Sequence, residues 1–243
     1  MHYPDLVAGT LLRRYKRFLA DVRLDDGREV VAHCPNTGSM RAVNVPGCRV
    51  WLAPSTNPAR KLAWTWELIE LPQPDGHMAL ASVHTGRANR IVEEALRASR
   101  VDELNGAGEW RREASVEGAR LDFRRPGEDG LDTFVEVKQV TLREGDGHGY
   151  FPDAVSARGR KHLETLATLA SRGHRAVLLF FVAHEGIADV APAAHLDPAY
   201  AETLVRVAGQ GVEVMARGVR IARGGDGQPL TVSMGEALPT RLV

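Results

Sequence analysis

The sequence of 243 residues has little cysteine, no long apolar run and no net charge. Its two cysteines, Cys34 and Cys48, are too few for a disulfide framework and lack the spacing of a zinc site. No stretch of about 18 apolar residues occurs, which argues against a transmembrane helix. The first residues also lack a basic region followed by an apolar core and a small-residue cleavage site. We therefore expect a cytoplasmic protein without a membrane partner.

The zero net charge comes from 31 basic and 31 acidic residues, which argues against a protein that coats nucleic acid through bulk charge alone. The charges are unevenly distributed: residues 1–70 hold 10 basic and 7 acidic residues, and the remainder holds 21 and 24. The basic excess is densest in "RRYKRF". This asymmetry points to an anionic partner for the first part of the chain.

The first part of the chain has the composition of short strands separated by Gly and Pro turns. We expect "LLRRYKRFLADVRL" to form one strand, joined to "REVVAHC" by a tight turn in which Gly27 has a positive φ. "PNTGS" reads as a second turn, and "CRVWLAP" and "AWTWELIEL" are rich in β-prone residues. This pattern predicts a small closed β-barrel over residues 1–80, with "PQPDG" (72–76) as a candidate boundary.

Residues 81–243 alternate between helical and strand patterns. Helical spacing of apolar residues predicts helices in "GRANRIVEEALRASR", "PDAVSARGRKHLETLATLASRG" and "DPAYAETLVRVAGQG". The second of these helices can be capped by Asp153 or Ser156, and Gly173 is a stop signal for it. Strands are expected at "EASVEG", "ARLDFRR", "TFVEVKQV", "RAVLLFFVA" and "VEVMARGVRI". This order predicts an α/β domain with a central mixed sheet flanked by helices.

Two neighbouring strands carry the residues that point to chemistry. Alternation places Asp122 on one face of "ARLDFRR", and both Glu136 and Lys138 on one face of "FVEVKQV". If the loop between them is a hairpin, Asp122 and Glu136 converge, and two close carboxylates repel unless a cation lies between them. Mg²⁺ or Mn²⁺ suits such hard oxygen ligands, so both residues are predicted metal ligands. Lys138 would orient the attacking water or stabilise charge on the scissile phosphate, which completes a catalytic set for phosphodiester hydrolysis.

A carboxylate on the preceding helix is a further catalytic candidate. Either Glu93 or Glu94 could supply it, and Glu93 is preferred because it shares a helix face with Asn89, four residues earlier. A solvated acidic helix face explains the same residues.

Three other segments are candidates for binding nucleic acid. The segment "RRYKRF" combines cations that can bind phosphates with an aromatic ring that can stack on bases. The turn "HCPNTGSM" offers polar groups that could contact phosphate, and basic residues near a helix N-terminus favour anions. The residues concerned are Arg13, Arg14, Tyr15, Lys16 and Arg17, then Asn36 and Thr37, and finally Arg160 and Lys161 with the neighbouring Arg158. Of these last three, Arg160 is the first choice for reaching the site. Solvated strand and helix faces are the alternative in the first and third segments.

The order of helix carboxylate, strand Asp, hairpin, Glu-X-Lys strand and basic helix resembles the PD-(D/E)XK nuclease superfamily. More narrowly, the chain resembles the sugar fermentation stimulation protein A (SfsA) family. The stretches that carry this resemblance run to about residue 215 and include "RYKRFLADV", "HCPNTGSM", "WTWELIEL", "NRIVEEAL", "VEVKQVTL" and "GYFPDAVSARGRKHLETL". The resemblance implies an N-terminal OB-like barrel (1–80) and a nuclease-like α/β domain (81–243), with Asp122, Glu136 and Lys138 as the acidic-acidic-lysine core.

The resemblance also implies non-sequence-specific DNA binding and a regulatory role in maltose and sugar metabolism. Two functions therefore stay open: a DNA-binding regulator that retains a nuclease-like site, and an active metal-dependent nuclease that acts on DNA or RNA. Single- or double-stranded DNA is the expected partner, and RNA and a second copy of the chain are further candidates.

Overall fold

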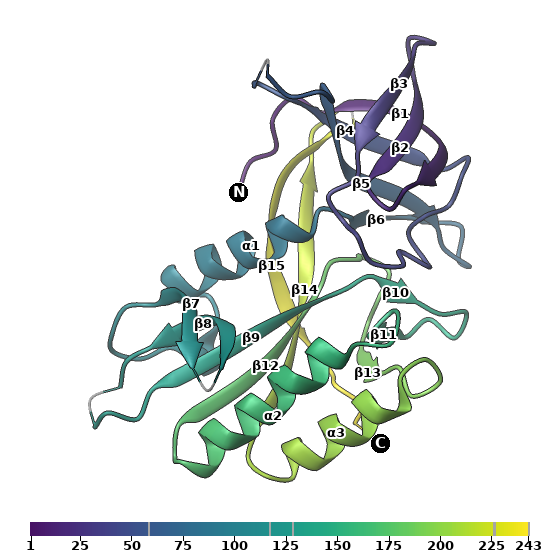
Figure 1. The fold of residues 1–243 in the computed structure, drawn as a ribbon. Coiled ribbons are helices and arrows are strands. Elements are labelled where there is room, and N and C mark those ends of the chain that lie inside the picture. The colour runs from purple at the N-terminus through teal and green to yellow at the C-terminus, as the bar shows by residue number, and fades with distance from the viewer. Residues whose placement is uncertain (58, 117, 128, 226, 243) are drawn as a thin grey trace.

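The computed structural model describes every residue except 58, 117, 128, 226 and 243. Figure 1 shows a β-barrel at the N-terminal end and a mixed-sheet domain with three helices below it. None of the helices in the described part of the chain is long and apolar enough to cross a membrane.

The barrel confirms the predicted OB-like domain. Its strands lie in the order β3-β2-β1-β4-β5-β6, and an additional pairing between β3 and β5 closes the first five into a barrel. Leu11, Val22 and Trp66 are fully buried in its core. The strands are β1 (Val7–Tyr15), β2 (Leu19–Leu24), β3 (Glu29–His33), β4 (Arg49–Pro54), β5 (Trp64–Pro72) and β6 (Met78–Ser82).

Two local expectations for this domain were wrong. "LLRRYKRFLADVRL" is not one strand but the β1–β2 hairpin, whose turn places Lys16 and Arg17 in the left-handed region at φ 48° and 64°. Residues 72–76 are not a domain boundary, because Gln73 N–H donates to the His77 carbonyl in the turn that joins β5 to β6. By contrast, Gly27 has the predicted positive φ, at 88°.

The second domain contains the predicted mixed sheet. Its strand order is β15-β14-β12-β9-β8-β7, in which β9, β12 and β14 are parallel and the other pairings are antiparallel. A small sheet, β10-β11-β13, and the strand β15 were not predicted. The strands are β7 (Arg111–Val116), β8 (Ala119–Arg125), β9 (Thr133–Val140), β10 (Leu142–Arg143), β11 (Gly149–Phe151), β12 (Arg175–Val182), β13 (Val190–Pro192), β14 (Glu213–Arg223) and β15 (Pro229–Leu238).

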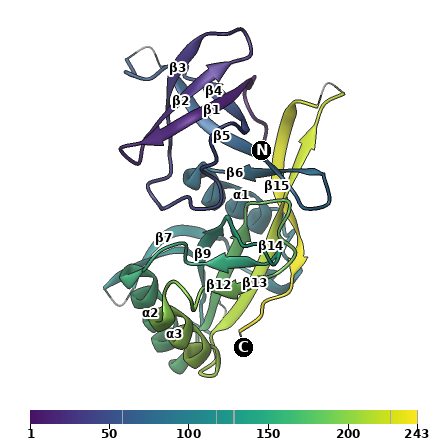
Figure 2. The same cartoon turned by 90° about the vertical axis from the view of Figure 1, so that its right-hand side faces the viewer.

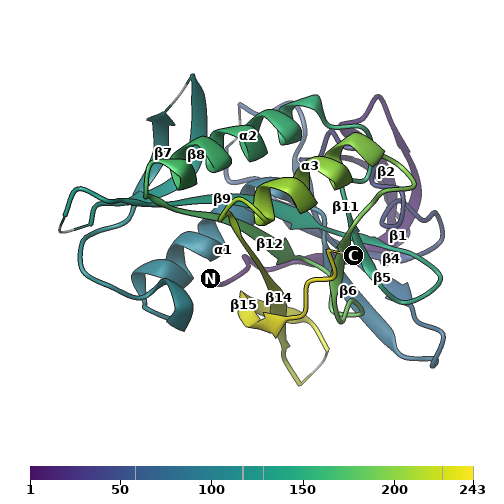
Figure 3. The same ribbon diagram turned by 90° about the horizontal axis from the view of Figure 1, so that it is seen from below.

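The helices cover both faces of the mixed sheet. Helices α2 and α3 pack side by side on one face and α1 packs on the other, as the view from below shows (Figure 3). This is why β12 is buried along nearly its whole length, as its continuous apolar run predicts. The helices are α1 (Thr85–Arg97), α2 (Ala157–Ser171) and α3 (Pro198–Ala208), with a short 3₁₀ helix η1 (Asp102–Leu104).

The ends of the chain tie the two domains together. Figure 2 shows the β14–β15 hairpin rising from the mixed sheet beside the barrel. The first residues run along β15, where Tyr3 N–H donates to the Leu230 carbonyl and Val232 N–H to the Met1 carbonyl. Between the domains, the backbone of Ala81 in β6 pairs with that of His184, which follows β12. The barrel is therefore fixed against the end of the sheet where the candidate site lies.

Candidate active site at the junction of the domains

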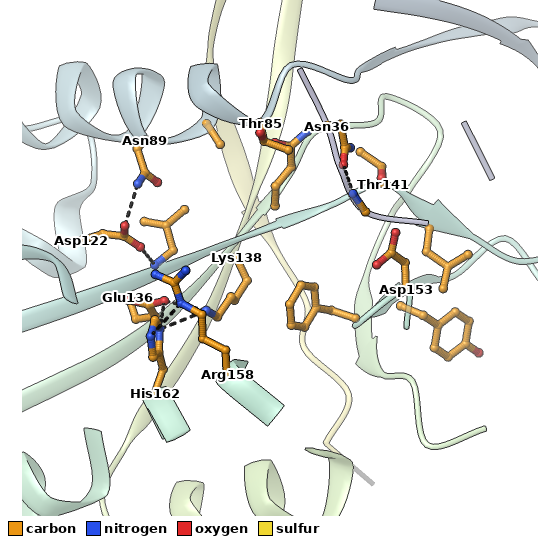
Figure 4. A pocket seen from close by; sticks show the side chains of 17 residues that line it. Asn36, Thr85, Asn89, Asp122, Glu136, Lys138, Thr141, Asp153, Arg158 and His162 are labelled. Atoms are coloured by element: carbon orange, nitrogen blue, oxygen red, sulfur yellow. Dashed lines mark hydrogen bonds and ion pairs between the residues drawn. The ribbon is translucent and has the colours of Figure 1, made fainter. Parts of the chain in front are cut away.

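A cavity of about 350 Å³ lies where the barrel meets β9, α1 and α2 (Figure 4). It contains the predicted core of two carboxylates and a lysine, together with polar residues from the barrel. Its lining is Asn36, Gly38, Thr85, Ala88, Asn89, Asp122, Glu136, Val137, Lys138, Gln139, Thr141, Leu142, Tyr150, Phe151, Asp153, Arg158 and His162.

Strand alternation aims Glu136 and Lys138 at helix α2. Val135 and Val137 pack in the core beneath α1, so Glu136 and Lys138 lie on the opposite face. Lys138 Nζ donates to Glu136 Oε1 at 2.5 Å. His162, which enters from α2, contacts the same oxygen, and since a carboxylate only accepts, the imidazole Nδ1 is the donor. The other ring nitrogen, Nε2, accepts from Arg158 Nε at 3.4 Å.

Asp122 lies where strands β8 and β9 separate. Their ladder ends at the pair Phe123 and Val135, so Asp122 is free to turn its carboxylate into the gap. Its Oδ2 accepts the Val137 N–H at 2.8 Å, and its Oδ1 accepts from the Asn89 side chain at 2.6 Å. The side chain thereby replaces a backbone partner of β9 and is held at the edge of the cavity.

The pKa values of the two carboxylates, Asp122 and Glu136, are shifted in opposite directions. Burial, followed by the neighbouring charge of Glu136, raises the pKa of Asp122 above its usual range. Burial also acts to raise the pKa of Glu136, but the hydrogen bonds from His162 and Lys138 outweigh it and hold that pKa low. Glu136 is therefore the carboxylate that stays ionised most readily.

The donor set fits one divalent cation of oxygen preference. Glu136 Oε2 is buried and has no hydrogen-bond partner, although its sister oxygen has two. A buried carboxylate oxygen without a partner is costly unless a cation or water completes it. Among the described residues, however, no cluster of three or more His, Cys, Asp or Glu side chains forms a complete cage. Asp122 and Glu136 would share the ion with water or substrate oxygens, as is usual for Mg²⁺.

The predicted helix carboxylate is not among the residues that line this cavity. Glu93 accepts from Arg97 at 3.1 Å and from Arg112 at 3.3 Å, and Glu94 contacts the N-terminal amine. It is Asn89, one turn earlier on the same helix face, that reaches Asp122. The helix face was inferred from sequence, but an amide takes the place expected for an acid.

The basic residues of α2 also differ from the prediction. Arg160 turns away to Asp197 at 3.1 Å, and Lys161 donates to the Gly118 carbonyl at 3.0 Å. Arg158 and His162 line the cavity instead. Their spacing of four residues, which places them on one helix face, is the sequence signal that could have identified the pair. The helix itself begins as predicted, with Ser156 Oγ accepting the Gly159 N–H at 3.0 Å.

Some of the predicted nucleic-acid-binding residues of the barrel bond to other residues of the barrel, whereas others line a hollow or face the solvent. Arg13 pairs with Asp21 at 2.7 Å beside the Tyr15 ring, and Arg14 donates to the carbonyls of residues 17, 36 and 38. Asn36 lines the cavity, whereas Arg17 and Thr37 line a neighbouring hollow. Lys16 lies in the exposed turn between β1 and β2. The loop 36–39 thus meets the site, as the polar composition of "PNTGS" suggested.

Comparisons with known proteins agree with this architecture. Residues 12–80 match the model of the SfsA N-terminal OB domain, and residues 86–225 match that of the sugar fermentation stimulation protein RE domain. The chain belongs to the SfsA family. The sugar fermentation stimulation protein homolog of Chromohalobacter salexigens is 66% identical over 242 residues, covering 100% of this chain and 95% of that protein. The homolog of a Marinomonas species is 49% identical, covering 98% and 90% respectively.

A solved structure of an SfsA protein has the same fold. Pyrococcus furiosus SfsA, determined in complex with Ca²⁺, superposes with a TM-score of 0.84 at 28% identity, covering 99% of this chain and 98% of that one. The predicted fold and family are confirmed by these matches.

Proposed function

We propose that this SfsA protein binds nucleic acid at the junction of its domains and hydrolyses phosphodiester bonds there with a divalent cation. The observation that carries the proposal is the convergence of Asp122, Glu136 and Lys138 in one cavity, where Glu136 Oε2 lacks a partner. DNA is the proposed partner, and RNA is the alternative substrate. A role in regulating sugar metabolism follows from the family name alone.

Asp122 and Glu136 would hold Mg²⁺ or Mn²⁺, and the Ca²⁺ of the Pyrococcus furiosus protein supports a cation with oxygen ligands. Such an ion lowers the pKa of a bound water and polarises a phosphoryl oxygen.

The remaining groups of the site would position the phosphate and Glu136 and neutralise negative charge. Lys138 Nζ, on a largely buried side chain beside Glu136, can donate to an oxygen of the scissile phosphate, whose charge grows in the transition state. His162 fixes Glu136 through Nδ1 and is itself oriented by Arg158. Arg158 also lines the cavity and supplies a second cation for an incoming phosphate.

A second function, nucleic-acid binding without cleavage, is favoured by a different observation. Glu136 Oε1 is already engaged by Lys138 and His162, and the described residues offer no third acidic ligand in a cluster. In that case the same cavity would bind phosphate and the protein would act as a DNA-associated regulator. A homodimer is compatible with either function.

One experiment separates these functions. Labelled single-stranded DNA, duplex DNA and RNA are incubated with wild type, Glu136→Ala and Lys138→Ala in Mg²⁺, Mn²⁺ or EDTA. Glu213→Ala is the matched control, because it removes a carboxylate and its contact with Arg175, neither of which lines the cavity. Metal-dependent cleavage that both site variants lose and the control retains supports the nuclease. Binding without cleavage supports the regulator, and cleavage retained by Glu136→Ala refutes the site assignment.

A further inference from the structure

The groups assigned to catalysis lie deep in the cavity. The side chain of Glu136 is only 3% exposed and that of Lys138 13% exposed. At about 350 Å³, the cavity is at the small end of the range for small-molecule sites. A phosphate must therefore enter the cavity to meet these groups, which favours a flexible single strand over a rigid paired one.

The barrel loop of residues 34–40 contributes Asn36 and Gly38 to the cavity lining. Thr85 Oγ1, at the start of α1, donates to the Pro35 carbonyl at 2.8 Å. At the other end of the loop, Ser39 Oγ and Met40 N–H donate to Asp153 Oδ2 at 2.8 and 3.1 Å. The loop is thus tied to α1 at one end and to the segment between β11 and α2 at the other, and it restricts the width of what can enter.

We propose, resting on the proposed function, that the site accepts an unpaired strand and excludes intact duplex. The substrate class is single-stranded nucleic acid or the unpaired tail of a duplex. An intact duplex would keep its phosphate outside the wall formed by the barrel loop, because its second strand cannot follow into the cavity.

A second hollow of about 500 Å³ provides the path for such a strand. It shares Gly38, Phe151 and Asp153 with the first cavity and extends to Arg17 in the turn between β1 and β2. Phe151 lines both hollows, and its ring also packs against the buried Tyr200. Arg17 lines the second hollow, where its guanidinium can contact the backbone phosphate of an unpaired strand without requiring any particular sequence.

Fluorescence anisotropy tests the proposal with one labelled DNA strand, offered alone, as a blunt duplex and as a duplex with an unpaired tail, in EDTA and in Ca²⁺. We expect the blunt duplex to bind at least about tenfold more weakly than the other two forms. Ser39→Ala weakens and Asp153→Ala removes the side-chain tie between the loop and the segment before α2, so both should narrow the ratio of single-strand to blunt-duplex affinity. The control Glu213→Ala should change neither affinity. Ser39→Ala is the milder variant should Asp153→Ala unfold, which a thermal melt detects.

The possible outcomes distinguish a failure of strand selection from a failure of the proposed function on which it rests. Equal binding of blunt duplex and single strand, both weakened by Lys138→Ala, would refute strand selection and leave the proposed function standing. Binding that Lys138→Ala does not weaken in any form would refute both.

Discussion

The buried ion pair between Arg87 and Glu67 joins helix α1 to barrel strand β5. Both guanidinium donors, Nε and Nη2, reach the carboxylate, the second at 2.5 Å to Oε1. The side chains are 11% and 2% exposed, and the Arg87 guanidinium also lies 4.9 Å from the centre of the Tyr3 ring. We expect Arg87→Ala to leave the Glu67 charge buried without a partner.

The burial of this pair sets the magnitude of the effect. Removing one partner of a buried ion pair destabilises a protein by about 3–5 kcal/mol, chiefly because the remaining charge is stranded. The double variant Glu67→Gln/Arg87→Met removes both charges and keeps the volume, so its free energy of unfolding should return to within about 2 kcal/mol of wild type. Such recovery distinguishes a stranded charge from lost packing.

Urea unfolding followed by tryptophan fluorescence measures both variants. Arg97→Met is the matched control, since Arg97 is 62% exposed and pairs with Glu93 on the same helix, and it should cost less than about 1 kcal/mol. A loss below about 1 kcal/mol for Arg87→Ala, or a double variant no more stable than the single one, would refute the reasoning.

Three further predictions concern the pH dependence of stability, the donor to the Asp122 carboxylate and the N-cap of helix α2. Burial, followed by the charge of Arg143, lowers the pKa of His184 from 6.5 to about 4. The unfolded chain therefore takes up a proton that the folded chain does not, and stability should fall by on the order of 3 kcal/mol as pH drops from about 6.5 to 4; His184→Asn should flatten this part of the thermal-melt profile, and an unchanged profile would contradict the assignment. Asn89→Ala should lower the cleavage rate about 10- to 100-fold with DNA affinity unchanged, because Asp122 loses its side-chain donor; a change in affinity alone would mean that Asn89 contacts the substrate. Ser156→Ala should cost about 1 kcal/mol by removing the N-cap of α2, and Thr168→Ala, on the exposed face of that helix, should cost clearly less in the same melt.

The parts of the fold that the sequence predicted are those in which one face is buried. The apolar stripe of α1 and the continuous apolar run of β12 leave little choice of period, and both elements formed where expected. The turn at Lys16 and Arg17 was missed because it contains no Gly or Pro, yet both residues adopt a positive φ. Strand β15 is largely half-exposed, so no alternation revealed it.

The candidate site was predictable to the extent that it depends on strand alternation. Glu136 and Lys138 share a face because they are two residues apart, and Asp122 follows from the hairpin. The hydrogen-bond partners of these residues lie on helices. A sequence alone predicts poorly how a helix is rotated about its own axis. A difference of one turn separates Asn89 from Glu93, and two positions separate Arg158 from Arg160.

Three of the first five residues of α1 connect the barrel to the site. Thr85 holds the barrel loop, Arg87 holds strand β5, and Asn89 holds Asp122. On a helix, positions 85 and 89 lie one turn apart on the same face, whereas position 87 points to the other side, where Arg87 reaches Glu67 of β5. A displacement of the barrel that moved this first turn would therefore shift the donor that fixes Asp122. The alignment of the carboxylate thus depends on the barrel being docked, even though none of the barrel's own side chains donates to it among the described contacts.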